Sequence, residues 1–267
     1  SEETKKRAQE KLSSFIVKIG YPDKWMDYSS LDIDESKTYY QNLEAAVRFM
    51  QADNLKDLGK PVDRTKWLMS PQEVNAYYMP TTNEICFPAG ILQPPFFNME
   101  ADDAVNYGAI GVVIGHEMTH GFDDEGSNFD KDGNMNNWWT AEDRQKFEAT
   151  TQRLAKQFSS VTVAPGLKAN GELTLGENIA DQGGLTIAYL ALQLAGEGQQ
   201  TMKIDGLTPA QRFYIAYARL WGQNITEAEI RRLTKLDPHS LGLLRVNQAL
   251  KNIDPFYKAF NIRPKDK

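Results

Sequence analysis

The chain is organised around Gly115-His116-Glu117-Met118-Thr119-His120-Gly121-Phe122-Asp123-Asp124, a segment with the pattern His-Glu-x-x-His. On a helix, residues four apart lie on the same face, so the imidazoles of His116 and His120 can converge on one metal ion. Glu117 then projects beside them. The pattern therefore predicts half of a catalytic zinc site.

The residues before this motif, Asp102 to Ile114, fit a helix with an aspartate at its start as cap and a wide apolar surface. Gly108, Gly111 and Gly115 each cost a helix about 1 kcal/mol relative to alanine. We therefore expect neighbouring elements to hold this helix on nearly all sides. Such a helix provides a rigid support for a metal.

A catalytic zinc site has a third protein ligand and leaves the fourth position to water. The chain has 3 histidines, so His239 is the remaining imidazole. Glu177 is the better candidate, because it lies in a segment with few charges and several glycines, which indicates burial. Buried carboxylates are almost always paired or metal-bound. The alternative for Glu177 is an ordinary charged helix face.

Two more carboxylates are spaced to orient the histidines. Asp181 follows Glu177 by one helical turn and can accept the free ring N–H of a ligating histidine. Asp123 follows His120 by three residues and can do the same for that ring. Such a contact fixes the tautomer of the histidine and its orientation.

Composition excludes several classes of protein. The 267 residues are 41% hydrophobic and 25% charged, which is ordinary for a globular protein. The net charge is -6 and no basic cluster stands out, so nucleic acid is not an expected partner. The apolar run from Ala109 to Gly115 is too short for a bilayer span, and the run from Leu185 to Gly196 is interrupted. Cys86 is the only cysteine, which excludes an internal disulfide.

Several motifs together resemble the neprilysin family of zinc endopeptidases, which includes the endothelin-converting enzymes and bacterial oligopeptidases. They are His116-Glu117-Met118-Thr119-His120-Gly121-Phe122-Asp123-Asp124, Gly176-Glu177-Asn178-Ile179-Ala180-Asp181, Asn75-Ala76-Tyr77-Tyr78, Phe87-Pro88-Ala89-Gly90-Ile91-Leu92-Gln93-Pro94-Pro95-Phe96-Phe97, Asn128-Phe129-Asp130-Lys131-Asp132-Gly133 and Asp237-Pro238-His239-Ser240. The resemblance extends over most of the chain and implies an enzyme that hydrolyses oligopeptides with one zinc ion per chain.

The resemblance also implies roles for single residues. His116, His120 and Glu177 hold the zinc, and Glu117 takes a proton from the attacking water and passes it to the departing amine. His239 donates to the oxyanion. We count Asp181 with the catalytic residues because it supports a ligand. The resemblance makes Arg245 the guanidinium that holds a substrate carbonyl.

The remaining implied residues bind substrate. Asn75 and the backbone of Ala76 hydrogen-bond the main chain of a peptide, although the residue alone also fits a core amide or a turn. Large apolar side chains form a pocket for the residue just after the cleaved bond, namely Ile91, Phe96, Val113 and Trp221. Without the resemblance, the two phenylalanine rings of Gln93-Pro94-Pro95-Phe96-Phe97 favour core packing. The pocket predicts cleavage on the amino side of Phe, Leu, Ile, Val or Met.

The expected fold is α+β and mainly α-helical, a thermolysin-like catalytic domain with a small sheet beside the zinc helix. Two strands around Val74–Pro80 and Glu84–Pro88 are predicted, joined by a turn. Helices are predicted over Glu2–Ile19 and Ser36–Leu55. We expect residues 1–60 to lead from an N-terminal lobe that this chain mostly lacks, and residues 61–267 to form the zinc peptidase domain.

Alternatives from other classes remain. One is a catalytically silent peptide-binding or adhesin-like protein that has kept the fold. Another is a fragment that is inactive without the N-terminal lobe, and a purely structural zinc site is the least favoured. The absence of disulfides favours a bacterial protein of the periplasm or cell surface, with the cytoplasm as the alternative. The natural substrate is not indicated by any motif.

Overall fold

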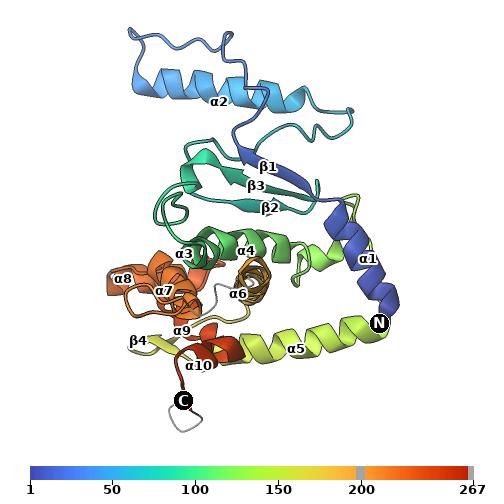
Figure 1. Cartoon of the computed structure of the whole chain (residues 1–267). Coiled ribbons are helices and arrows are strands. Elements are labelled where there is room, and N and C mark those ends of the chain that lie inside the picture. Colours follow the sequence, from blue (N-terminus) through green and yellow to red (C-terminus); the bar gives the residue numbers. More distant parts are fainter. Residues whose placement is uncertain (197–201, 264–267) are drawn as a thin grey trace.

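The computed structural model describes residues 1–196 and 202–263, and the fold of these residues is mainly helical α+β (Figure 1). The helices are α1 (Glu2–Ser13), α2 (Tyr39–Leu55), α3 (Asp103–Asn106), α4 (Val112–His120), α5 (Ala141–Ser159), α6 (Leu175–Ala195), α7 (Pro209–Leu220), α8 (Glu227–Leu236), α9 (Gly242–Asn247) and α10 (Asp254–Ala259). The strands are β1 (Ile16–Gly20), β2 (Tyr77–Met79), β3 (Glu84–Pro88), β4 (Thr162–Ala164) and β5 (Leu167–Lys168). In Figure 1 the sheet lies above α4, with α6 below it. The predicted fold class is confirmed.

The main sheet has the order β1-β3-β2, with β1 parallel and β2 antiparallel to β3. The predicted hairpin of β2 and β3 is confirmed. The helix predicted over Glu2–Ile19 is wrong beyond Ser13, because Ile16–Gly20 is strand β1. Its apolar spacing fits a helix, but its β-branched residues pair with a strand nearly seventy residues away, as in Ile16 opposite Glu84. Strand β1, within the predicted leading segment 1–60, thus shares a sheet with the predicted catalytic domain.

The zinc helix is held between two apolar clusters, as its glycine-rich sequence predicts. On the sheet side, Ile110 packs in a cluster with Ile85 and Phe87. On the opposite side, Val112 packs with Leu185 of α6 and with residues of α7. The helical path from α3 to α4 includes a π-helical turn, Tyr107–Gly111. There the amide of Ile110 donates to the carbonyl of Phe96 at 2.8 Å, which ties the helix to the preceding loop.

Helices α4 and α6 cross with their backbones in contact at two glycines. A Cβ on Gly184 would lie 2.5 Å from the carbonyl oxygen of Val112 and 2.9 Å from the amide nitrogen of His116. A Cβ on Gly115 would lie 2.9 Å from the Cα of Gly184. Only glycine fits this crossing, which brings α6 close to the metal-binding face of α4.

We expect Gly184→Ala to lower the free energy of unfolding by about 1–3 kcal/mol, because the methyl group forces the two helices apart. The shift should also weaken zinc binding. Gly111→Ala is the matched control, since a Cβ there meets its nearest neighbour at 3.5 Å and alanine favours helix. Chemical denaturation of both variants measures the difference. Equal stability of the two variants would contradict the tight crossing.

A buried lysine joins α1 to the loop after the zinc helix. The ammonium group of Lys11 donates to the carbonyl oxygens of Gly121 at 2.6 Å, Gly126 at 2.7 Å and Phe129 at 2.7 Å. These three bonds fix the backbone between the zinc helix and α5. The ammonium also lies within 6 Å of the ring centroids of three aromatic residues, Tyr78, Phe122 and Trp138.

Burial lowers the pKa of Lys11 to about 8, although the nearby carboxylates of Asp123 and Asp130 oppose the shift. The lysine therefore still carries its charge at neutral pH. Its three carbonyl contacts use all three ammonium protons, so its hydrogen-bonding capacity is fully used inside the protein.

Helix α2 stands apart from the other elements at the top of Figure 1. Thr38 caps it in a capping box with Gln41, but none of its residues is buried. Its exposed apolar side chains are Tyr39, Tyr40, Leu43, Val47, Met50 and Leu55. Across the described ranges, none of the helices combines the length and the apolar character that a bilayer span requires.

Candidate active site

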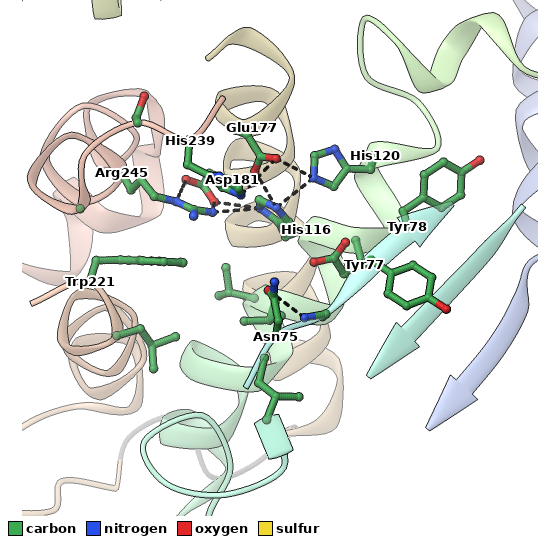
Figure 2. A pocket seen from close by; sticks show the side chains of 18 of the residues that line it. Asn75, Tyr77, Tyr78, His116, His120, Glu177, Asp181, Trp221, His239 and Arg245 are labelled. Atoms are coloured by element: carbon green, nitrogen blue, oxygen red, sulfur yellow. Dashed lines mark hydrogen bonds and ion pairs between the residues drawn. The ribbon is translucent and has the colours of Figure 1, made fainter. Parts of the chain in front are cut away.

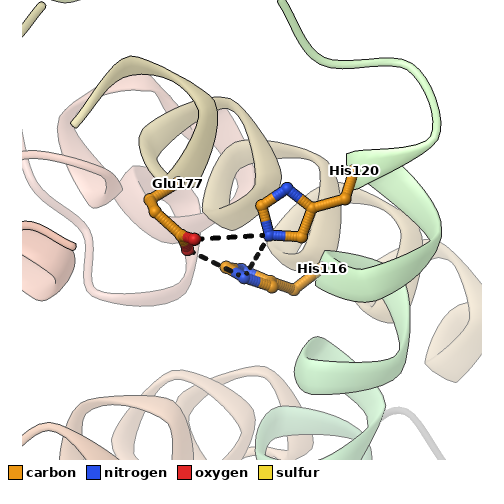
Figure 3. A group of neighbouring side chains, drawn as sticks. All are labelled: His116, His120 and Glu177. Carbon is orange, nitrogen blue, oxygen red and sulfur yellow. Dashed lines mark hydrogen bonds and ion pairs between the residues drawn. The ribbon is translucent and has the colours of Figure 1, made fainter. Parts of the chain in front are cut away.

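Three side chains from two helices converge on one point (Figure 3). His116 and His120 extend from α4, and Glu177 from the first turn of α6. Their ligand atoms all lie within 4.8 Å of one another. His116 Nε2 and His120 Nε2 are 3.0 Å apart, and the carboxylate oxygens of Glu177 lie 3.1 and 3.6 Å from them. This is the donor set and open geometry of a catalytic zinc site.

The electrostatics of this group fit a cation at its centre. Burial disfavours the protonated ring of His120, but hydrogen bonds to Asp123 and Glu177 outweigh it and raise its pKa to about 11. Burial raises the pKa of Glu177, but its contacts with the two histidines lower that pKa more strongly, so the net shift is downward. Glu177 Oε2 is buried and lacks an aligned hydrogen-bond partner. A divalent cation would satisfy this oxygen and the two facing ring nitrogens together.

Each histidine is oriented by a carboxylate on its other ring nitrogen. Asp181 Oδ1 lies 2.9 Å from Nδ1 of His116, and Asp123 Oδ2 lies 2.7 Å from Nδ1 of His120. With Nδ1 protonated and donating, Nε2 of each ring presents its lone pair to the centre. Asp123 is itself held by the amides of Glu125 at 2.9 Å and Gly126 at 2.6 Å.

Arg245 has a structural partner that the sequence did not indicate. Its Nε and Nη2 donate to the two carboxylate oxygens of Asp181 at 2.8 and 2.6 Å. Its guanidinium lies 3.7 Å from the ring centroid of Trp221. Burial raises the pKa of Asp181, and the charge of Arg245 lowers it. The net shift of this pKa is downward. Arg245 therefore stabilises the carboxylate that orients His116.

Glu117 lies beside the metal-binding group and also lines the cavity. Its side chain is buried, and burial raises its pKa although the neighbouring histidines oppose the shift. It is not one of the three clustered ligand residues. A carboxylate of raised basicity next to a metal centre is suited to take a proton from water.

His239 reaches the same centre from the loop after α8. Its Nε2 lies 3.3 Å from Glu177 Oε1, and its Nδ1 lies 2.8 Å from Asp237 Oδ1. The loop is tied to α6 because Ser240 Oγ donates to Asn178 Oδ1 at 2.8 Å. Asp237, Ser240 and Asn178 are supports that the sequence analysis did not assign, although each lies within two residues of a predicted site residue.

These groups share one cavity of about 600 Å³ (Figure 2). It brings together all residues that the resemblance assigns to substrate binding: Asn75, Ala76, Ile91, Phe96, Val113, Trp221 and Arg245. Figure 2 shows Trp221 on the opposite side of His116 from His120. The amide of Ala76 donates to the side chain of its own neighbour, Asn75 Oδ1, at 3.0 Å.

Comparison with known proteins gives consistent matches. The model of peptidase family M13 matches residues 75–267. Neprilysin-11 of Caenorhabditis elegans is 43% identical over 267 residues, which is 96% of this chain and 32% of that protein. The Mycobacterium tuberculosis zinc metalloprotease Zmp1 in complex with an inhibitor matches with a TM-score of 0.96 and 47% identity. PepO from Lactobacillus rhamnosis matches with a TM-score of 0.90 and 37% identity.

Both structural matches cover 100% of this chain and 41% of the other chain. The chain thus spans about a third of the length of Neprilysin-11 and less than half of the two bacterial proteins. The region matched by the family model contains the two zinc-motif histidines, Glu177 and His239. Family match, fold and metal-site geometry agree, and the chain belongs to peptidase family M13, of which it carries the catalytic portion with its zinc site.

Proposed function

We propose that this protein is a zinc-dependent endopeptidase that binds one zinc ion per chain and cleaves oligopeptides before a large apolar residue. The observation that carries the proposal is the convergence of His116, His120 and Glu177 in a cavity that Glu117 and His239 also line. The three ligand side chains would hold zinc, which when bound supplies a Lewis acid for the peptide carbonyl and a water molecule.

The protein's own residues perform the proton transfers. Glu117 accepts a proton from the attacking water, and its burial favours the protonated form that follows. The same carboxyl then gives the proton to the departing amine. With both ring nitrogens protonated, His239 donates from Nδ1 to Asp237 Oδ1 and from Nε2 toward the oxygen that gains charge. Asp181 and Asp123 keep the ligand rings in place.

The apolar end of the cavity supports the proposed preference for the residue after the cleaved bond. Ile91, Phe96, Val113 and Trp221 line it and bring no formal charge. Full burial of a Leu, Phe or Met side chain against such a surface contributes a favourable free energy of about 1.5–3 kcal/mol. The edge strand β2 next to Asn75 and Ala76 offers backbone groups for an extended peptide.

The proposal includes a second lobe that covers the substrate. Neprilysin-11 is about three times as long as this chain. The apolar side chains of α2 are exposed, and α2 lies away from the helical part of the fold. Packing against another lobe would bury them. The division at residue 60 stays a prediction; β1 pairs with β3, and Lys11 of α1 donates to the carbonyl oxygen of Gly121.

A mixed peptide pool tests the function directly. We expect the zinc-loaded protein to produce new amino termini that begin with Phe, Leu, Ile, Val or Met, and a zinc chelator to abolish them. Mass spectrometry identifies the termini. Cuts that persist with the chelator would contradict metal dependence, and cuts before charged residues would contradict the apolar pocket. Bound zinc without any cuts would favour the silent peptide-binding alternative.

A further inference from the structure

The acidic side chains that line the cavity differ in whether they have a partner within the protein. Six carboxylates line it: Glu117, Asp123, Glu125, Glu177, Asp181 and Asp237. Four of them contact histidines, and Glu117 is buried beside the metal-binding group. Among the described residues, the side chain of Glu125 makes no hydrogen bond or ion pair, and Glu125 is exposed. Among the six carboxylates that line the cavity, Glu125 is thus the one that is neither in contact with a histidine nor buried.

Its backbone is firmly held. The amide of Glu125 donates to Asp123 Oδ1 at 2.9 Å, and the next carbonyl, that of Gly126, accepts from Lys11 at 2.7 Å. A charged group on a fixed backbone can discriminate between ligands without first ordering a loop. The carboxylate of Glu125 is therefore presented to the cavity from a rigid support.

Two basic side chains that bond residues close to Glu125 in the sequence are engaged elsewhere. Lys11 uses its protons on three carbonyl groups. Arg144 donates to Ser127, Asn128 and Glu148. Neither forms an ion pair with Glu125, so the charge of Glu125 is not neutralised within the described part of the chain.

Glu125 lies on the His120 side of the metal-binding group, since its amide donates to Asp123, which contacts His120. Trp221 lies on the His116 side, since it stacks on Arg245, which shares Asp181 with His116. Val113 precedes His116 by one turn of α4, while Glu125 follows His120 by five residues. From Val113 to His120 the helix rises by about 10 Å. In Figure 2, Trp221 and His120 lie on opposite sides of His116. A peptide that puts its apolar side chain near Val113 therefore extends its amino-terminal side toward Glu125.

We propose that Glu125 is a specificity residue that selects substrates with a cationic group on the amino side of the cleaved bond. This inference rests on the proposed function, because it takes the apolar pocket as the site of the residue after that bond. The cation is an Arg or Lys side chain, or the α-ammonium group of a short peptide. Its recognition is an exposed ion pair, for which we expect a roughly two- to five-fold effect.

The test compares N-acetylated peptides that carry Arg or its neutral isostere citrulline at one to three positions before a single Leu or Phe. We expect kcat/KM of the intact zinc-loaded protein to be roughly two- to five-fold higher for an Arg peptide. In Glu125→Gln the ratio should fall to about one. Glu172→Gln is the matched control, because it removes an equally exposed charge that does not line the cavity. A second arm compares short peptides with free and acetylated amino termini.

Binding to the Glu117→Gln variant separates this inference from the proposed function. The same peptides, fluorescently labelled and measured by anisotropy, should show the same charge preference without cleavage. Binding preference lost in Glu125→Gln would support the inference even if the parent protein cut no peptide. A preference found only for free amino termini would identify the α-ammonium group as the cation. An Arg-to-citrulline ratio of one together with no effect of acetylation, or ratios unchanged in Glu125→Gln, would overturn it.

Discussion

Replacing Glu117 with glutamine should reduce turnover by about 10²- to 10⁴-fold while the protein keeps its zinc. The amide has nearly the shape of the carboxylate but cannot accept the proton of the attacking water. Glu117 is not one of the three clustered ligands, so metal binding does not depend on it. Burial already raises its pKa, which means that a neutral side chain is tolerated at this position. Single-turnover kinetics and zinc analysis of the same sample measure the two effects.

The matched control for this variant is Glu172→Gln, an exposed site outside the cavity. It should cleave peptides at the rate of the parent protein. Comparable rates for Glu117→Gln and the parent would remove the general-base role. Loss of zinc from Glu117→Gln would instead show that this carboxylate supports the metal site.

Asp181→Ala should have the second large effect, because one buried carboxylate serves two partners. It accepts from Nδ1 of His116 and from the guanidinium of Arg245. Loss of a carboxylate that orients a metal-bound histidine typically lowers metal affinity 10- to 100-fold, and we expect about that loss here. The unpaired charge of Arg245 would remain buried, at a cost of about 3–5 kcal/mol in the free energy of unfolding.

Competition with a chelator measures the zinc affinity, and denaturation of the zinc-free protein measures the stability separately. Asp124→Asn is the matched control, since Asp124 is a neighbouring, partly buried carboxylate whose Oδ1 has no hydrogen-bond partner. It should bind zinc as the parent does. If Asp181→Ala held zinc as tightly as Asp124→Asn, Asp181 would not orient His116 in the metal complex.

Much of the fold and of the candidate site could be predicted from local patterns in the sequence. The zinc motif, the helix of Glu177 and the β2–β3 hairpin are each encoded within about twenty residues, where spacing and turn residues are informative. Strand β1 was missed because its stability comes from pairing with β3, far along the chain. Its alternation of exposed and buried residues is short, and the same residues fit a helical face. Local propensity cannot decide between the two when the partner strand is distant.

In the candidate site too, contacts between residues close in sequence could be predicted, and contacts between residues far apart in sequence could not. The supports of the histidines were predictable where they lie one turn away on a helix or within the motif itself, as for Asp123. The pairing of Arg245 with Asp181 joins residues 64 positions apart, and no spacing rule indicates it. The free charge of Glu125 became apparent only when the histidine partners of four other cavity carboxylates and the burial of Glu117 were known.

Lys11 makes the active site dependent on a part of the chain that precedes it by more than a hundred residues. Lys11 adds a charged donor to three carbonyl groups of the backbone after the zinc helix, of which those of Gly126 and Phe129 also accept from Phe129 N and Trp138 Nε1. Because these bonds tie α1 to that backbone, the two segments should unfold as one cooperative unit. Closing so long a loop is also slow relative to forming either helix. The zinc site is therefore expected to be completed late in folding, and a catalytic domain trimmed at residue 60 would lose the lysine that bonds these three carbonyl groups and the strand that pairs with β3.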